Sequence, residues 1–550
     1  MRIFRHPSEG AIGRIAYPNF AAMEGAPRMS EALEQLLASV LSADEYSFDP
    51  AQLALVSADV YSEGLPVAAV ITPRDKARCA AAIGVLTAAG HAIVARGGGM
   101  SYTGGYLATR AGTVLVDTSR LDRIVEINAE DLYITCEAGV TWKRIYEALR
   151  PLGLRLPFFG TFSGAQATVG GGMSNGALFL GTARYGTGAD CMLGMEIALA
   201  DGRILCTGQR AVRNARKPFF RTYGPDLSGL FIHESGALGV KLQVTFRLIR
   251  TPAHTGFASF VFDGMEAAAR ALSEVARTGA AEEAYVFDPA STRKNLRSAG
   301  LLSDAGKLLS VVRAERGFWR GLWAGAKLVA AGRGFLPEDA YSLHVVCAAR
   351  SDAALRADLA AIATACSTHG GAAIPDSIPR AVRADLFPAP DGVLGPDGDR
   401  WAALNAKVAH SEAAEIIAAC RAALAPHAAR MQANGVWMSH LLIAIGSNAF
   451  SFEPVFHWHD RWLPMHETMP SAATLAKLPR PAANPVATEL VAELRQVLIK
   501  EFVRLGAASN QIGKTYPYLS VLRTESAELL TELKRVVDPK GLVNPGALGF

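Results

Sequence analysis

Short apolar runs rich in β-branched residues alternate with alanine-rich stretches between residues 66 and 252. The short runs have the length of buried strands, and the longer stretches between them have helical composition. The expected strands cover residues 67–71, 92–95, 113–117, 124–127 and 133–137, and the expected helices cover residues 73–89 and 141–150. Proline begins the first helix, and Thr141 is a suitable cap for the second. The pattern predicts a domain in which strands and helices alternate.

The pattern changes after Pro252 to long alanine-rich helices, expected at 265–278 and 353–369, with short strands such as 342–346. This texture predicts a second domain of the α+β type. The glycine- and proline-rich segment 388–398 predicts a surface loop or lid. We expect an N-terminal extension at 1–60, a first domain at 61–252, a second domain at 253–488 and a C-terminal return at 489–550 that packs on the first domain.

Two glycine-rich loops follow strands of the first domain. Residues 95–105 read Ala-Arg-Gly-Gly-Gly-Met-Ser-Tyr-Thr-Gly-Gly, and residues 160–176 hold a second cluster. Glycine permits positive φ and lets successive backbone N–H groups converge on an anion. The first loop matches neither the Gly-x-Gly-x-x-Gly nor the Gly-Lys-Ser/Thr pattern. We therefore expect a diphosphate site of another kind, in which both loops hold one large ligand.

Composition narrows the class of protein and of partner. The 550 residues are 50% hydrophobic and 19% charged, which is typical of an ordered globular chain. The net charge of +4 is spread without any run of Lys or Arg, so nucleic acid is not an expected partner. Seven scattered cysteines without a Cys-x-x-Cys pair indicate buried thiols in a reducing compartment. Neither a signal peptide nor a spanning helix is recognisable, so the expected location is cytoplasmic.

Four ordered elements carry a resemblance to a known family. They are the loops at 96–105 and 160–176, a Gly-x-Asp-Leu…Ser-x-Gly-x-Leu-Gly-Val element at 224–240, and Asp-Pro…Asn-Pro-Gly at 538–546. In this respect the chain resembles the flavoproteins of the vanillyl-alcohol oxidase and p-cresol methylhydroxylase family. The resemblance implies an α+β protein with a two-subdomain FAD-binding domain and an α+β substrate (cap) domain built on an antiparallel sheet.

The resemblance also implies which residues bind FAD. They are Arg96, Gly97, Gly98, Gly99, Met100, Ser101, Tyr102, Gly104, Gly105, Gly160, Thr161, Gly164, Thr168, Gly170, Gly171, Asn175, Gly236, Gly239, Val240 and Asn544. Some family members attach the flavin through a histidine of the first loop, but this chain has no histidine between His91 and His233. Covalent attachment there is not expected, whereas attachment through a histidine of the second domain stays open.

Three activities follow from the resemblance. The first is an FAD-dependent dehydrogenase or oxidase that transfers a hydride from the alcohol carbon of a 2-hydroxy acid, of the D-lactate or glycolate type, to flavin N5. The alternative is oxidation of a para-substituted phenol. A further alternative is a flavin-bearing electron-transfer subunit of a complex. The electron acceptor stays open between oxygen, a quinone and a cytochrome.

Two segments carry the candidate chemistry. In residues 508–518 we assign Tyr516 and Lys514 as catalytic donors that hold an oxyanion, and Asn510, Gln511 and Tyr518 as substrate-binding residues. Family members that oxidise 2-hydroxy acids carry a Glu-His or His-His pair where Asn510 and Gln511 stand. Amides orient a substrate but do not act as a base, so the base must lie elsewhere.

The second segment is 439–460. Many hydroxy-acid dehydrogenases of this type carry a metal-ligand pattern that begins with a histidine, but after His440 the second ligand is missing in this chain. We assign His440 to substrate binding and no residue to a metal. His457 and His459 alternate along an expected strand, so with Glu453 they are candidates for catalytic base and orienter, for a replacement metal site, or for a merely polar strand face.

Residues 313–334 form a further candidate element. Arg313, Arg316 and Arg320 fall on one side of an expected helix, and Trp319 lies on the apolar side. Such a helix fits either docking on its own domain or peripheral contact with the inner face of a membrane. The expected partners are a small-molecule substrate and a second copy of the chain in a homo-oligomer.

Overall fold

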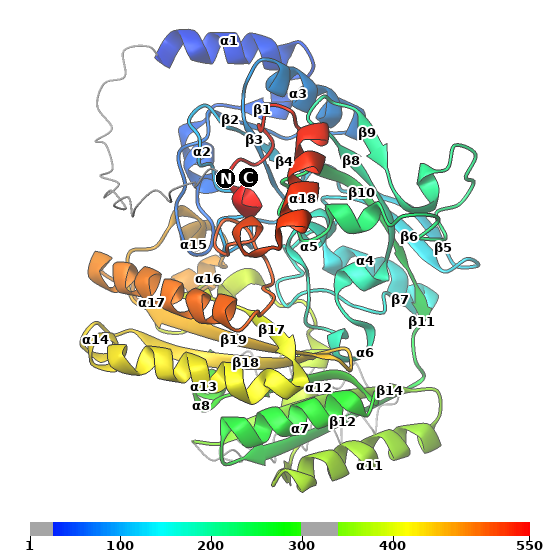
Figure 1. Ribbon diagram of the computed structural model, residues 1–550, viewed down its shortest axis with the longest axis vertical. Coiled ribbons are helices and arrows are strands. Elements are labelled where there is room, and N and C mark those ends of the chain that lie inside the picture. Colours follow the sequence, from blue (N-terminus) through cyan, green and yellow to red (C-terminus); the bar gives the residue numbers. More distant parts are fainter. Residues whose placement is uncertain (1–25, 299–338) are drawn as a thin grey trace, which may run out of the picture.

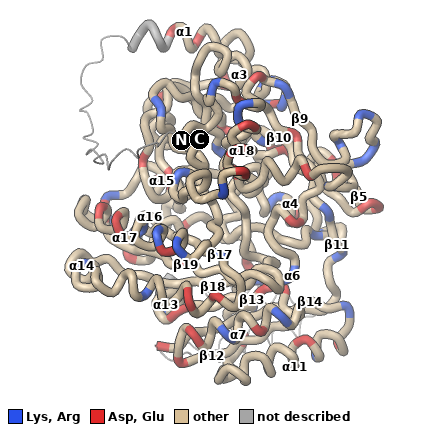
Figure 2. The backbone as a smooth tube through the Cα atoms, viewed as in Figure 1, with Lys and Arg blue, Asp and Glu red and all other residues tan. Residues whose placement is uncertain are grey.

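A computed structural model describes residues 26–298 and 339–550 of the chain. The segment 313–334 lies outside these described residues. Figure 1 shows two stacked modules, with the smaller sheets in the upper one and one large sheet backed by helices in the lower one. Basic and acidic residues are interspersed over both modules (Figure 2). We call the upper module the FAD module and the lower one the cap.

The first sheet of the FAD module has four strands in the order β1-β2-β4-β3. Its strands are β1 (Tyr46–Ser47), β2 (Ala69–Ile71), β3 (Ile93–Arg96) and β4 (Val114–Asp117), and helices α1 (Ala26–Ala38) and α3 (Lys76–Ala88) pack beside it. Strands β2, β4 and β3 run parallel, and helix α3 connects β2 to β3, in keeping with the expected alternation of strands and helices. Helix α3 begins later than expected because the Asp75 carboxylate accepts the backbone N–H of Arg78 and so caps its first turn.

The second sheet of the FAD module is antiparallel and has five strands in the order β5-β6-β10-β8-β9. Its strands are β5 (Ile124–Asn128), β6 (Tyr133–Glu137), β8 (Met192–Ala198), β9 (Ile204–Cys206) and β10 (Val240–Arg247). Helix α4 (Trp142–Leu149) follows β6, and the Thr141 hydroxyl caps it as expected. Further elements of this module are α2 (Pro50–Val56), β7 (Leu154–Arg155), α5 (Val169–Asn175), α6 (Thr182–Tyr185) and β11 (Ile249–Arg250).

The cap is built on an antiparallel sheet in the order β15-β12-β14-β13-β18-β19-β16, with β17 also paired to β19. Its strands are β12 (His254–Phe262), β13 (Ala281–Phe287), β14 (Tyr341–Ala349), β15 (Ala372–Ile374), β16 (Arg400–Ala403), β17 (Ala406–Ala409), β18 (Trp437–Ile445) and β19 (Ala449–Trp458). The main helices are α7 (Met265–Arg277), α11 (Asp352–Thr368), α13 (Ala413–Leu424) and α17 (Pro485–Arg504). The antiparallel α+β cap is therefore confirmed.

Further helices complete the cap and the C-terminal part. They are α8 (Pro289–Ser298), α12 (Ser377–Ala384), α14 (Ala428–Ala433), α15 (Pro464–Thr468), α16 (Ala472–Leu475) and α18 (Thr524–Val537). None of the helices in the described part of the chain combines the length and the apolar character needed to cross a membrane. All seven cysteines are free thiols, and six of them are buried.

The two faces of the cap sheet have different neighbours. On one face, Val286, Leu442 and Phe452 share a core with helices α7, α13 and α17. On the other face, Tyr285 and Ile443 pack with residues of the FAD module. The side chains that reach the space between the modules are therefore the alternate residues of each strand on this second face, which we call the inner face.

The C-terminal return begins later than residue 489. Helix α17 packs on α13 and β19, and its buried residues Leu490, Leu494 and Leu498 belong to the core of the cap. Its apolar stripe can be buried only against the cap helices, so α17 completes the cap instead of leaving it. The chain then crosses between the modules and ends with α18 on the FAD module, where Lys534 is buried and donates to the carbonyl oxygen of Ala237.

Candidate active site

The first glycine loop follows β3 and lies against the second loop. A side chain at Gly97 would overlap the Thr168 hydroxyl, and a side chain at Gly98 would overlap the carbonyl oxygen of Gln166. Gly99 has φ of +72°, a conformation that glycine adopts without strain. Glycine is needed here because the two loop backbones come into direct contact.

The second loop leads into α5, whose first turn is capped by Thr168. A Cβ on Gly172 would lie 2.5 Å from Cζ2 of Trp142, and a Cβ on Gly170 would lie 2.8 Å from a neighbouring side chain. Both distances are shorter than van der Waals contact. The glycines therefore let α5 pack closely beneath the loops, and its backbone borders the space between them.

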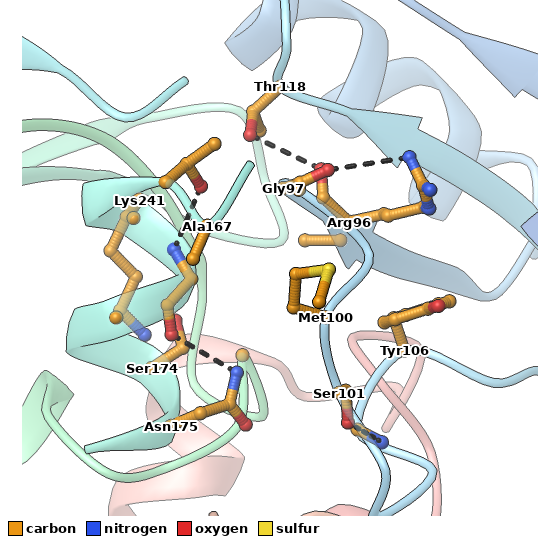
Figure 3. Close-up of a pocket in the computed structure, with 18 of the residues that line it drawn as sticks. Arg96, Gly97, Met100, Ser101, Tyr106, Thr118, Ala167, Ser174, Asn175 and Lys241 are labelled. Atoms are coloured by element: carbon orange, nitrogen blue, oxygen red, sulfur yellow. Dashed lines mark hydrogen bonds between the residues drawn. The ribbon is translucent and has the colours of Figure 1, made fainter. Parts of the chain in front are cut away.

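A cavity lies between the loops, lined by their glycine backbones and by hydroxyl, amide and guanidinium groups. Figure 3 shows Arg96, Gly97, Met100 and Ser101 on one wall and Ala167, Ser174 and Asn175 facing them. Most residues expected to bind FAD line this cavity. They are Arg96, Gly97, Gly98, Gly99, Met100, Ser101, Gly105, Thr161, Thr168, Gly170, Gly171, Asn175, Gly236, Gly239 and Val240.

The remaining residues expected at the FAD site are not among those that line the cavity. They are Tyr102, Gly104, Gly160, Gly164 and Asn544. The Asn544 side chain donates to the carbonyl oxygen of Gly105 at 2.8 Å, and the Gly104 N–H donates to the Asp59 carboxylate at 2.7 Å. These contacts hold the shape of the first loop from outside.

Several polar atoms at the cavity have no partner within the protein. Among the described residues, the Asn175 Oδ1 acceptor and the Trp142 Nε1 donor are buried and unpaired, although both residues line the cavity. Buried polar groups are almost always hydrogen-bonded in native proteins. A ligand with several polar groups, such as FAD, fits these atoms and the glycine-lined walls, and the residues of the two loops would hold it.

The inner face of the cap sheet carries a carboxyl group, that of Glu453, close to this cavity. The strand register places Glu453 opposite Leu441 on β18, and the Asn405 side-chain amide donates to its carboxylate at 3.4 Å. Burial raises the pKa of the Glu453 carboxyl to about 7, despite this hydrogen bond, which favours the charged form. A carboxyl group with this pKa can act as a base near neutral pH.

Two phenol groups lie beside Glu453. The Tyr516 hydroxyl accepts the backbone N–H of Asn405 at 2.7 Å, and the Tyr102 hydroxyl accepts from the Gln511 amide at 2.9 Å. Burial holds the pKa of both phenols above the usual value, and the negative charge of Glu453 adds to this effect. Both phenols therefore stay neutral and keep an O–H to donate. Gln511 also lines the cavity, so this group of residues adjoins the FAD site.

A lysine occupies the same inner face. Lys407 on β17 lies opposite Ser451 of β19, and its ammonium group donates to Asn510 Oδ1 at 2.7 Å. Burial lowers the pKa of Lys407 to about 8. The His233 imidazole lies near Asn510, and its Nε2 atom is buried without a partner among the described residues.

The other residues assigned to catalysis or substrate lie elsewhere. His457 accompanies Glu453 on the inner face, but it lies four positions further along the strand, a rise of about 13 Å. It pairs with Ser439 and Asp399. His459 is exposed and contacts the carbonyl oxygen of Asp397 at 3.2 Å. The expected triad of Glu453, His457 and His459 is therefore not assembled.

Three further assignments also differ from the structure. His440 points to the helix-covered face of the sheet, where it pairs with Asp288 at 2.9 Å. Lys514 donates to the carbonyl oxygen of Leu107 and supports the first loop. Tyr518 packs at the edge of the cap core. Strand parity explains the first difference, because adjacent residues of a strand face opposite sides.

Asn405, Lys407 and His233 are missing from the sequence-based assignment. Asn405 directly precedes β17, Lys407 lies on β17, and His233 lies in the segment before β10. Only the pairing of β17 with β19 brings Asn405 and Lys407 beside Glu453. No group of three or more His, Cys, Asp or Glu residues that could hold a metal occurs within residues 26–298 and 339–550.

Comparison with known proteins agrees with this geometry. Residues 67–208 match the family described as FAD binding domain. The mitochondrial D-lactate dehydrogenase (cytochrome) 1 of Saccharomyces cerevisiae is 32% identical over 189 residues, which are 34% of this chain and 30% of that protein. Glycolate oxidase subunit GlcD of Bacillus subtilis is 28% identical over 207 residues, which are 38% of this chain and 42% of that protein. The matched part thus spans between about a third and two fifths of these curated relatives.

Solved structures extend the likeness over both modules. A p-cresol methylhydroxylase with bound substrate superposes with a TM-score of 0.69 at 18% identity, covering 95% of this chain and 97% of the other. The 4-ethylphenol oxidase from Gulosibacter chungangensis gives 0.67 at 16% identity, with coverage of 95% and 97%. The fold is therefore of the p-cresol methylhydroxylase type. Residues 67–208 match the FAD binding domain family, and this match together with the cavity supports FAD as the cofactor.

Proposed function

We propose that this protein is an FAD-dependent oxidoreductase that removes a hydride from the alcohol carbon of a 2-hydroxy acid. The observation that carries the proposal is the Glu453 carboxyl, with its pKa raised by burial to about 7, on the inner face of the cap beside the FAD cavity. Bound FAD supplies the hydride acceptor, N5 of its ring system. The chain itself must then remove the hydroxyl proton.

Glu453 is suited to accept that proton. Its pKa of about 7 lies near neutral pH, and a general base is most effective when its pKa is near the operating pH. Asn405 donates to the carboxylate and fixes its orientation. Tyr102 and Tyr516 are buried beside Glu453, and their O–H groups are suited to donate to the substrate oxygen.

The relatives support the alcohol donor. The proteins matched in the FAD module are named for D-lactate and glycolate, whose oxidised carbons both carry a hydroxyl group. The matched residues lie in the cofactor domain, so the substrate has to be argued from the cap of this chain. There, a carboxylate base and a lysine share one face, which suits a substrate with both an alcohol and an anionic group.

A para-substituted phenol is the second candidate substrate. The two phenol side chains beside Glu453 favour it, because Tyr102 and Tyr516 could donate to a phenolate oxygen. The fold likeness over both modules is also to a p-cresol methylhydroxylase and a 4-ethylphenol oxidase. In this function Glu453 would act on the para substituent.

Anaerobic mixing separates the candidates. The FAD-loaded protein is mixed without oxygen with D-lactate, glycolate, vanillyl alcohol or p-cresol, and flavin absorbance is followed. We expect bleaching by a 2-hydroxy acid and a rate at least 100-fold lower in Glu453→Gln, as removal of a general base predicts. Bleaching by the phenols alone would replace the first function with the second. No bleaching by any of the four compounds would favour an electron-transfer subunit.

A further inference from the structure

We propose that Lys407, together with Asn510 and His233, binds the carboxylate of the substrate and so selects anionic alcohols over neutral ones. The inference rests on the proposed function and adds a specificity site to it. It is carried by the position of three side chains from three segments that meet at the edge of the FAD cavity.

The three side chains converge around Gly176. A Cβ on this glycine would lie 2.6 Å from Asn510 Oδ1 and 2.6 Å from His233 Nε2, so both groups reach the same point. Asn510 in turn accepts from Lys407 at 2.7 Å. Asn175, next to Gly176, lines the FAD cavity and has a buried, unpaired Oδ1 atom. The cluster is therefore contiguous with the cavity wall.

The hydrogen-bond inventory leaves donors free for an anion. An ammonium group carries three donors, and for Lys407 the described residues show one acceptor, Asn510 Oδ1. His233 Nε2 is buried without a partner in the same part of the structure. A carboxylate offers acceptors for both groups, and it supplies the negative charge that a buried ammonium group otherwise lacks.

Two residues at this cluster also have an unusual backbone conformation. His233 and Gln511 have φ of +57° and +48°, in the left-handed region that non-glycine residues rarely adopt. The backbone of His233 is held by a bond to Met173, and that of Gln511 by a bond to Asn175 at 3.0 Å. Strain of this kind persists where the surroundings fix a functional geometry.

The spacing of Lys407 and Glu453 suits a 2-hydroxy acid. Glu453 lies two residues beyond Ser451, the cross-strand partner of Lys407, and such diagonal neighbours lie about 7–8 Å apart. The hydroxyl and the carboxylate of a 2-hydroxy acid sit on adjacent carbons, so one molecule reaches both groups with a hydrogen bond at each end. Lys407 would hold the carboxylate while Glu453 accepts the hydroxyl proton.

Other charged groups near the cluster are few. The Asp190 carboxylate raises the pKa of both Lys407 and His233 from a distance, while it accepts from Thr187. Burial and the nearby Lys407 charge hold the pKa of His233 down to about 4, so the imidazole is neutral at pH 7. Lys407 is therefore the cation of the cluster.

The test is equilibrium binding of pyruvate, the product expected from D-lactate, to FAD-loaded protein, followed by perturbation of the oxidised flavin spectrum. We compare the wild type with Lys407→Met and with Lys500→Met, a control at an exposed lysine of α17. We expect the Kd to rise about 10- to 100-fold in Lys407→Met, as loss of a charge-assisted bond predicts. The control should bind as the wild type does. FAD content and the urea midpoint verify that each variant is folded.

Two further readouts make the result decisive. The KM for D-lactate should rise more than kcat falls in Lys407→Met, whereas kcat/KM for the neutral analogue lactamide should change less than threefold. Pyruvate affinity of the wild type should weaken above about pH 8, where Lys407 loses its proton, and this trend should vanish in Lys407→Met.

Equal losses for D-lactate and lactamide, or an unchanged Kd for pyruvate, would overturn the assignment of Lys407 while leaving hydroxy-acid oxidation intact. If no 2-hydroxy acid reduces the wild-type flavin, the proposed function itself is wrong, whatever the effect of Lys407→Met. Reduction by phenols with no effect of Lys407→Met would overturn both proposals.

Discussion

The Glu453→Gln variant should unfold less readily than the wild type while losing most of its activity. Glutamine has the size of glutamate and can still accept the hydrogen bond from Asn405, so the packing is kept. The carboxyl group, however, has its pKa raised from 4.5 to about 7 by burial. That rise corresponds to a cost of about 3 kcal/mol for keeping an ionised group in the folded site.

The sign of the pH dependence follows from linkage. Between pH 4.5 and 7 the folded protein holds a proton on Glu453 that the unfolded chain has lost, so wild-type stability falls as pH rises through this window. The variant has no titratable group at this position, so it lacks this pH-dependent loss of stability. We therefore expect the stability advantage of the variant to be below about 1 kcal/mol at pH 5 and to reach about 3 kcal/mol at pH 8.

The assay is urea unfolding of the apo proteins at pH 5 and pH 8, with anaerobic flavin reduction measured on the FAD-loaded proteins. The control is Glu525→Gln, because Glu525 is an exposed carboxylate in the first turn of α18. A variant that is less stable at pH 8, or a gap that does not change with pH, would refute a buried carboxyl group with a raised pKa. Unchanged flavin reduction would remove Glu453 from the reaction.

Three other outcomes follow from the same geometry. Gly98→Ala should lose most bound FAD, because its Cβ would overlap the second loop, whereas the control Gly392→Ala has open space around its Cβ and should keep a full complement of FAD. The flavin-to-protein absorbance ratio measures the FAD content of both variants. Normal FAD content in Gly98→Ala would contradict the loop contact. The pH profile of kcat/KM should be bell-shaped. It should rise through about pH 7 as Glu453 ionises and fall above about pH 8 as Lys407 loses its proton. A flat profile from pH 6 to 9 would exclude Glu453 as the base and Lys407 as the carboxylate-binding group. His440→Asn should keep kcat/KM within about threefold, because His440 faces the helices of the cap and not the cavity; a loss beyond about 100-fold would show that the inner face has been misassigned.

The glycine loops could be predicted from sequence because the need for glycine arises from short-range backbone contacts. Consecutive glycines at 97–99 and 170–172 report backbone contacts within a few residues of themselves, and the structure places both runs on the cavity wall. The helix at 73–89 and the strand at 133–137 were also predictable, since each carries its own apolar pattern and, for the helix, its own cap. The expected start of the C-terminal return was wrong because the proline-rich stretch 479–485 that leads into helix α17 does not reveal which core that helix joins.

The candidate catalytic side chains depend on long-range register and were harder to predict. His457 and His459 were expected to act with Glu453 but have other partners, because shared strand parity does not imply proximity. The role of Glu453 stays a prediction. The positions of Asn405 and Lys407 beside Glu453 depend on the pairing of β17 with β19, which the sequence pattern does not reveal. The expected contact of segment 313–334 with a membrane and the homo-oligomer stay predictions.

The central claim is that FAD held between the two glycine loops receives a hydride from a 2-hydroxy acid whose proton passes to Glu453. The most direct measurement is an anaerobic titration of the purified FAD-loaded protein with D-lactate and with glycolate, with the 2-oxo acid quantified at the end. We predict that one of the two acids bleaches the flavin completely and yields one equivalent of 2-oxo acid per FAD. A flavin that stays oxidised with excess of both acids, in protein that carries its full complement of FAD, would contradict the account.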